Sequence, residues 1–178
     1  MNTPKQENLA VDLDQNSKEA TGYVQFIVFS VGNEDYGLEI EKVQEVIRMK
    51  IIKKLPRTPN FILGVMNLRG NIIPVVGLRE KFNMEPVEYT EFTRIIVVNH
   101  RNKLVGMVVD EVNRVVDVQH ENIEGNPDMV SSKTRALVRG VAKIAEEIFI
   151  LIELDYLLFS LNEIQKSLAE AQSVVNNE

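Results

Sequence analysis

The stretch GVMNLRGNIIPVVGL, residues 64–78, decides how the fold of this chain is read. Two apolar runs are joined by a short polar connector, which is typical of two strands in a hairpin. Gly70 supplies the residue that a tight hairpin turn requires, because glycine takes a positive φ at no steric cost. The turn does not require Arg69, which stands just before this glycine. The role of Arg69 therefore has to be found in what surrounds the hairpin.

The composition restricts the class of protein. Of 178 residues, 44% are hydrophobic and 26% are charged, which is typical of one globular domain or of two small lobes that share a core. The net charge is −6, and Lys and Arg are scattered among Asp and Glu. This argues against nucleic-acid binding, which depends on clustered basic residues. The absence of cysteine excludes disulfides and thiolate chemistry.

The N-terminus and the apolar runs bear on localisation. Residues 1–21 are polar and predict a flexible tail without the features of a signal peptide. No apolar run approaches the ~20 residues that a membrane-spanning helix needs. We therefore expect a cytoplasmic protein whose fold occupies residues 22–178.

Most of the ordered chain is predicted to form strands. β-branched and aromatic runs separated by turn residues occur at 23–31, 35–40, 46–52, 64–78, 93–100, 103–110 and 138–154. Many short strands at hairpin spacing favour small barrels over alternating strands and helices.

The two halves of the chain resemble each other. With an offset of 69 residues, residues 27–46 align without gaps on residues 96–115, with six identities in twenty positions. With an offset of 76, Gly64, Val65 and Leu78 fall on Gly140, Val141 and Leu154. We therefore expect two copies of one β unit, related by an approximate internal rotation, with residues 27–46 superposing on 96–115.

The end of the chain predicts a helix. Leucine and isoleucine follow helical spacing from Leu154 to Leu168, and such a stripe can pack on a barrel. Ser160 and Glu163 fit a capping box, so two helical pieces that meet near Phe159 are an alternative. Residues 173–178 are expected to fray.

No catalytic site is recognisable. His100 and His120 lie in a turn and in a polar segment, and both are expected to be solvated. The sequence contains no glycine-rich phosphate loop and no nucleophile elbow. Acidic pairs such as Asp110–Glu111 and Glu146–Glu147 are expected to be solvated surface. We expect no enzyme, no metal and no cofactor.

An interaction surface is the remaining possibility. Glu45 follows the strand that ends at Ile40, and Arg114 takes its place in the second copy. Val43 and Val112 stand just ahead of these charges, in stretches that look too short and polar for deep strands. An apolar residue beside a charge is typical of a docking patch, although a single valine is more often part of a core.

The whole pattern resembles the CheW-like domain family of bacterial chemotaxis coupling proteins. The resemblance is carried by FIVFSVGNEDYGLEIEKVQEV (26–46), by PRTPNFILGVMNLRGNIIPVVGLREKF (56–82), and by TRIIVV (93–98), VGMVVDEV (105–112) and ILIELDYLL (150–158). It spans roughly residues 23–159. The N-L-R-G core and its flanking strands are more specific than a lone glycine motif.

The resemblance implies a mainly β fold with two SH3-like five-stranded β-barrel lobes, short helices and a C-terminal helix. The implied domain is 22–159, with lobe 1 at about 35–83 and lobe 2 at about 93–154. Strand 23–31 and the C-terminal helix would join the lobes, and residues 160–178 would form that helix and a frayed end.

The resemblance also implies a function. The protein would be a non-catalytic adaptor that couples the cytoplasmic tips of chemoreceptors to the histidine kinase CheA. It would be recruited to membrane-associated receptor arrays through these partners. Carried over by motif, the residues of partner contact are Val43, Glu45, Arg69, Arg94 and Val115. Arg69 would then hold a partner carboxylate or carbonyl through its planar fork. The alternative is that it pairs with a carboxylate of its own lobe.

Two positions depart from the family pattern. Gly77 stands where Asp is usual, and as the cap of a helix at 78–82 it costs only a few tenths of a kcal/mol. Any charge contact of that Asp is in doubt here. Asn83 replaces a glycine and tolerates the left-handed conformation at the helix end.

Other functions remain as alternatives. The regulatory domain of the kinase itself is disfavoured because no ATP-binding sequence precedes residue 23. A chemosensory pathway that controls a process other than swimming stays open. From other classes come a small β-barrel hydrolase with paired carboxylates and an oligonucleotide-binding barrel, the latter disfavoured by the lack of a basic groove.

Overall fold

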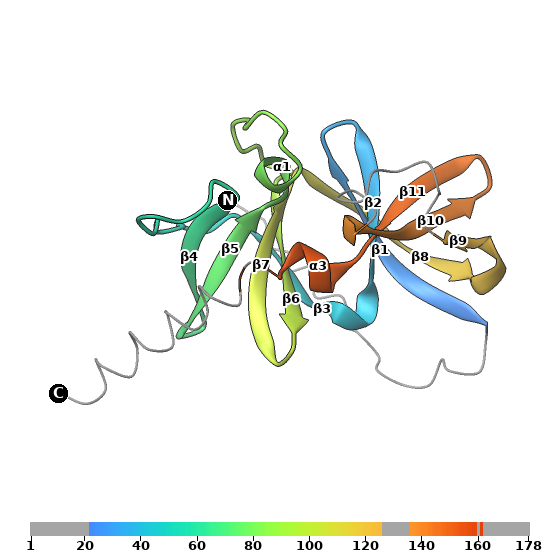
Figure 1. The fold of residues 1–178 in the computed structure, drawn as a ribbon, viewed down its shortest axis with the longest axis horizontal. Helices are drawn as coiled ribbons and strands as arrows, with labels where there is room; N and C mark the ends of the chain where they lie inside the picture. The colour runs from blue at the N-terminus through green and yellow to red at the C-terminus, as the bar shows by residue number, and fades with distance from the viewer. Residues whose placement is uncertain (1–21, 126–135, 160, 162–178) are drawn as a thin grey trace, which may run out of the picture.

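The computed structural model describes residues 22–125, 136–159 and 161. The fold is mainly β, and its strands form two sheets that lie side by side (Figure 1). The tail expected at 1–21 lies outside the described residues. So do the capping box and nearly all of the helix expected after Phe159.

The first half of the described chain contains five strands and two short helices. They are β1 (Tyr23–Val31), β2 (Glu34–Glu39), η1 (Ile40–Lys42), β3 (Val43–Arg48), β4 (Ile62–Leu68), β5 (Asn71–Gly77) and α1 (Leu78–Lys81). The second half contains β6 (Arg94–His100), β7 (Lys103–Val109), β8 (Glu111–Gln119), η2 (His120–Asn122), β9 (Ile123–Gly125), β10 (Val138–Ile144), β11 (Glu147–Ile152) and α3 (Leu154–Leu157). The strand expected at 46–52 is shifted: β3 begins at Val43, and Ile51 is exposed outside it.

The two sheets do not follow the expected lobe boundaries. The six-stranded sheet has the order β8-β1-β2-β11-β10-β9, and the five-stranded sheet has the order β3-β6-β7-β5-β4. The prediction of one lobe at 35–83 and another at 93–154 is therefore wrong. Each sheet takes the first two strands of one repeat and the last three repeated strands of the other. The physical reason is that the opening hairpin of each repeat finds its antiparallel neighbour, β8 or β3, in the other half of the chain.

The pairing registers confirm the internal repeat. In the hairpins β1–β2 and β6–β7, Val28 pairs with Gly37 as Val97 pairs with Gly106, which keeps the offset of 69. In the parallel pairs Leu151–Gly37 and Val75–Gly106, Val75 and Leu151 keep the offset of 76 and the two glycines keep the offset of 69. The β-bulges between Val43 and Glu45 and between Ile62 and Gly64 also have counterparts at the equivalent places. Closure of each sheet into an SH3-like barrel stays a prediction.

Three clusters of buried side chains hold the sheets together. Along β6, Ile95 and Val97 face one cluster inside the five-stranded lobe, whereas Ile96 and Val98 face a central cluster. Because successive strand residues point to opposite faces, both faces of β6 are buried, and this explains its unbroken apolar run. The central cluster also contains Phe29 of β1 and Leu157 of α3, so it joins both sheets.

The short helix α1 follows the expectation for residues 78–82. Gly77 is its N-cap in an extended conformation and Phe82 its C-cap, and Asn83 has a φ of 57°. An N-cap glycine makes no side-chain hydrogen bond here. The departures from the family pattern at Gly77 and Asn83 therefore leave the helix in place.

Candidate functional site

The β4–β5 hairpin closes with a two-residue turn at Arg69 and Gly70. Leu68 pairs with Asn71, and the two turn residues have φ values of 49° and 88°. Two successive positive φ angles are typical of a type I′ turn, whose twist matches that of the strands. The Asn67 side chain accepts a hydrogen bond of 2.8 Å from the Gly70 N–H. The backbone therefore requires Gly70 but leaves the identity of residue 69 free.

Arg69 and Glu45 form a bidentate pair. Arg69 Nη1 and Nη2 donate to Glu45 Oε1 and Oε2, both at 2.8 Å. The Arg69 side chain is 73% exposed, whereas that of Glu45 is 19% exposed. The pair ties the turn after β4 to β3 at the other edge of the five-stranded sheet. Glu45 thus holds the arginine in one orientation while most of its surface stays open to a partner.

Val43 is not part of this surface. The bulge between Val43 and Glu45 pairs Val43 with Val98 and Glu45 with Val97, so the two side chains point to opposite faces. Val43 is buried at 8% exposure in the central cluster. The interpretation of Val43 as an exposed docking residue is therefore wrong, as is the expectation that it lies outside a strand.

The structure does not bring the other two candidates to the Glu45–Arg69 pair. Arg94 lies at the start of β6, opposite Arg48 on β3, and its Nη1 donates to the carbonyls of Glu91 at 2.6 Å and Thr93 at 2.9 Å. Val115 lies on β8 in the six-stranded sheet and is 44% exposed. Of the five predicted contact residues, Glu45 and Arg69 form one paired site, Arg94 and Val115 lie at separate surface positions, and Val43 is buried.

The six-stranded lobe carries an ion pair of opposite polarity at the position equivalent to Glu45. Arg114, which takes the place of Glu45 in the repeat, pairs with Glu147 at the start of β11. The expectation that Glu146 and Glu147 are solvated surface residues is confirmed, since both are exposed, but Glu147 also has an ion-pair partner. The opposite charges at positions 45 and 114 were visible in the alignment of the halves, but the sequence did not reveal Glu147 as the partner.

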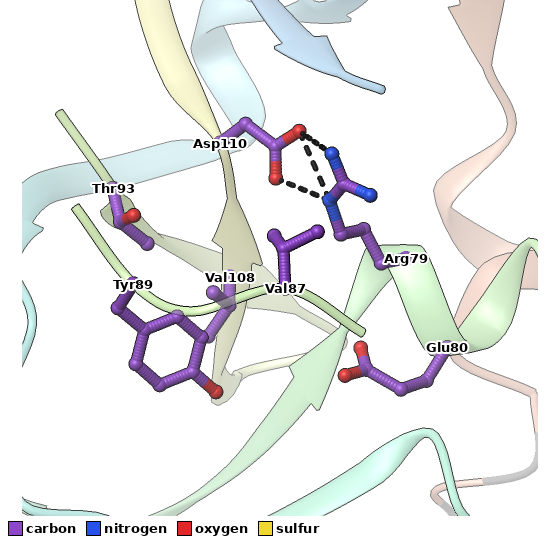
Figure 2. A pocket seen from close by; sticks show the side chains of 7 residues that line it. All are labelled: Arg79, Glu80, Val87, Tyr89, Thr93, Val108 and Asp110. Atoms are coloured by element: carbon purple, nitrogen blue, oxygen red, sulfur yellow. Dashed lines mark hydrogen bonds and ion pairs between the residues drawn. The ribbon is translucent and has the colours of Figure 1, made fainter. Parts of the chain in front are cut away.

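A second polar contact joins the two sheets at α1. Arg79 Nε donates to Asp110 Oδ1 at 2.8 Å and Arg79 Nη2 donates to Asp110 Oδ2 at 2.7 Å (Figure 2). The Gly32 N–H of the β1–β2 turn also donates to Asp110 Oδ2, at 2.8 Å. Although burial raises the pKa of Asp110, the hydrogen bonds from Arg79 and Gly32 hold it below its usual value. The expectation that Asp110 is simply solvated is wrong, because a distant arginine reaches it.

The counterpart of this contact lies at α3. Asp155 Oδ1 is 3.2 Å from His100 Nδ1 and 3.9 Å from Arg101 Nε in the β6–β7 turn. His100 is 6% exposed, so the expectation of a solvated histidine is wrong for this residue, whereas His120 is exposed as expected. Burial lowers the pKa of His100 below its usual value, although the Asp155 carboxylate opposes this shift.

Metal ligands and membrane-spanning helices can be assessed for the described residues. Among them, no group of three or more His, Cys, Asp or Glu side chains is placed to hold a metal ion. Their helices also include none that is long and apolar enough to cross a membrane.

Comparisons with known proteins agree on one family. The model of the CheW-like domain matches residues 25–161. The chain is 38% identical to "Chemotaxis protein CheW" of Klebsiella aerogenes, over 76% of this chain and 82% of that protein. It is 32% identical to the protein of the same name in Bacillus subtilis, over 74% and 85%. Among solved structures, the scaffolding protein TtCheW from Thermoanaerobacter tengcongensis matches with a TM-score of 0.71 and 38% identity, over 76% of this chain and 92% of that one.

Proposed function

The chain belongs to the CheW-like domain family, and we propose that it is a non-catalytic adaptor that couples chemoreceptors to the histidine kinase CheA in chemotaxis. Relatives at 38% and 32% identity are named chemotaxis proteins, and a structural neighbour is named a scaffolding protein. An adaptor needs exposed and preorganised contacts rather than a reactive site. Its partners would be the cytoplasmic hairpin of a receptor and the regulatory domain of the kinase. It would bind them on the cytoplasmic side of receptor arrays.

The Glu45–Arg69 pair is the observation that carries the proposal in this structure. An arginine fixed by a less exposed carboxylate loses little conformational freedom when it binds. Its outward surface can accept a partner carboxylate or carbonyl beside the pair. Arg69 and Glu45 are therefore proposed as one partner contact, and Arg94 and Val115 as further contacts at separate positions.

The test is a titration of the chain with a receptor cytoplasmic fragment and with the kinase regulatory domain. Arg69→Ala should weaken binding by ~2 kcal/mol, about thirtyfold, because interface arginines are often hot spots. Arg69→Lys should rescue only part of the affinity, since an ammonium cannot form the fork. The melting temperature should change little.

Two further variants separate partner binding from stability. Glu45→Arg combined with Arg69→Glu keeps an ion pair but gives it the polarity of Arg114 and Glu147, so the fold should persist while binding is lost. Arg101→Ala is the matched control, because Arg101 opens the β6–β7 turn with a φ of 51° and is 65% exposed. If the wild type binds neither partner, the adaptor function is wrong. If Arg69→Ala lowers only the melting temperature, Arg69 is a structural turn residue.

A further inference from the structure

An apolar surface on the five-stranded lobe is left uncovered in the described structure. Ile51 is 91% exposed, and with Met49, Ile52, Leu63 and Tyr89 it lines an open hollow between β3 and β4. Tyr89 and Val87, each about half exposed, also line a second, smaller pocket beside Arg79 and Asp110 (Figure 2). Tyr89 therefore joins Ile51 and Val87 into one apolar strip. Exposed apolar strips of this kind mark interaction surfaces.

Two segments of opposite charge meet at this strip. Residues 46–60 contain five basic side chains and no acidic one, and Lys50 and Lys54 line the hollow next to Ile51. Residues 82–93, which contribute Val87 and Tyr89, contain three glutamates and no basic side chain. All eight charged residues are exposed, and within the described part of the chain none of their side chains forms an ion pair.

We propose that a second copy of this chain docks on the apolar strip, about a two-fold axis that crosses the strip between its basic end at Ile51 and its acidic end at Val87. A two-fold contact brings together the same surface of both copies with its ends exchanged, so the lysine segment beside Ile51 faces the glutamate segment beside Tyr89 of the other copy, and the reverse. The surface is thus complementary to itself in charge, and its centre is apolar with a polar rim.

Other occupants fit the charges less well. An anionic membrane or a nucleic acid would be attracted by Lys50 and Lys54 but repelled by the exposed Glu88 and Glu91 of the segment that contributes Tyr89. A partner of a single charge sign would leave one of the two segments opposed. The strip is small, so the dimer should be weak, and it should weaken further as salt screens the exposed charges.

The experiment uses the full chain and measures its mass in solution by sedimentation at rising concentration. Lys50→Glu with Lys54→Glu should weaken self-association by about tenfold or more, because glutamates at positions 50 and 54 then face the acidic segment 82–93 and the net charge of the basic segment falls. Glu88→Lys with Glu91→Lys should do the same through two basic segments. An equimolar mixture of the two variants should recover association, since the glutamates introduced at positions 50 and 54 of one variant face the lysines introduced at positions 88 and 91 of the other. Lys103→Glu with Lys143→Glu, two exposed lysines elsewhere, is the matched control and should behave as the wild type.

The outcomes are separable from the coupling function. A wild type that stays monomeric at about 1 mM overturns the proposal, since a weaker contact would be worth less than ~4 kcal/mol. The proposal also fails if the mixture does not recover association. The proposal also fails if the wild type does not self-associate but binds anionic vesicles, and the variant Lys50→Glu with Lys54→Glu does not bind them. The strip would then be a membrane-binding surface. Both charge variants should bind the receptor fragment and the kinase domain as the wild type does, when the titration is made at a protein concentration at which the chain is monomeric.

Discussion

The two repeats of the chain share a backbone register but carry opposite charges at equivalent positions. Glu45 on β3 binds Arg69, whereas Arg114, its equivalent on β8, binds Glu147. At the short helices, Arg79 of α1 binds Asp110 near the β1–β2 turn. The equivalent residue of α3 is Asp155, which contacts the β6–β7 turn.

This difference shows which features the fold constrains. Strand pairing depends on apolar alternation, bulges and glycines, and these are repeated. An exposed ion pair contributes little to stability, so reversing its polarity costs the fold little. The two lobes can therefore present different charges at their ends while keeping one architecture, which is compatible with the proposed adaptor function.

The glycines at the β4 and β10 bulges should give the largest effect and sharpen the comparison. A Cβ on Gly64 would lie 2.0 Å from the Lys53 carbonyl oxygen, and Gly64 has a φ of 142°. At Gly140 the equivalent atom would lie 2.2 Å from the Glu124 oxygen, but no positive φ adds strain and β9 is a three-residue edge strand. We expect Gly64→Ala to cost about 3 kcal/mol or more in the free energy of unfolding, and Gly140→Ala less. Urea denaturation measures both, and equal losses would contradict the expected difference.

The two inter-sheet contacts should respond differently when their carboxylates are removed. Asp110→Ala leaves a partly buried Arg79 and the Gly32 N–H without their acceptor, so we expect a loss of about 2 kcal/mol. The Asp155 side chain is 63% exposed, and Asp155→Ala should cost less than about 1 kcal/mol. Thermal unfolding of the two variants side by side measures this. A larger loss at Asp155 would contradict this and show that the polar contact at α3 contributes more to stability than the one at α1.

The smallest effect is a difference in pH dependence. The lowered pKa of His100 means that the unfolded chain binds a proton more readily, so stability is fully present above pH ~6.5 and falls as the pH drops below it. The lowered pKa of Asp110 acts in the same direction but only below pH ~4. His100→Val introduces the residue found at the equivalent position, Val31. It should make the free energy of unfolding depend less on pH between pH 6.5 and 5. An unchanged slope in that range, by urea titration at each pH, would exclude His100 as its source.

Much of the fold could be predicted because it rests on short-range patterns. The hairpin of residues 64–78, its turn at Gly70, the helix at Leu78 and the repeat with offsets of 69 and 76 all follow from local residue order. Prediction was weaker where a strand is half exposed, as in β8, whose alternation is partly polar, and where a bulge moved Val43 away from the face of Glu45.

The sequence by itself determined the mainly β class, the two repeats and the likeness to one family, because apolar alternation and turn glycines act over a few residues. Only the tertiary structure decided that the repeats exchange their hairpins between two sheets, since strands of different repeats pair across distances in sequence that local patterns do not encode. It also decided which charges meet. Arg69 reaches Glu45, Arg79 reaches Asp110 and His100 is buried next to Asp155, because folding brings together turns that are far apart in the sequence. Local sequence patterns do not predict such contacts.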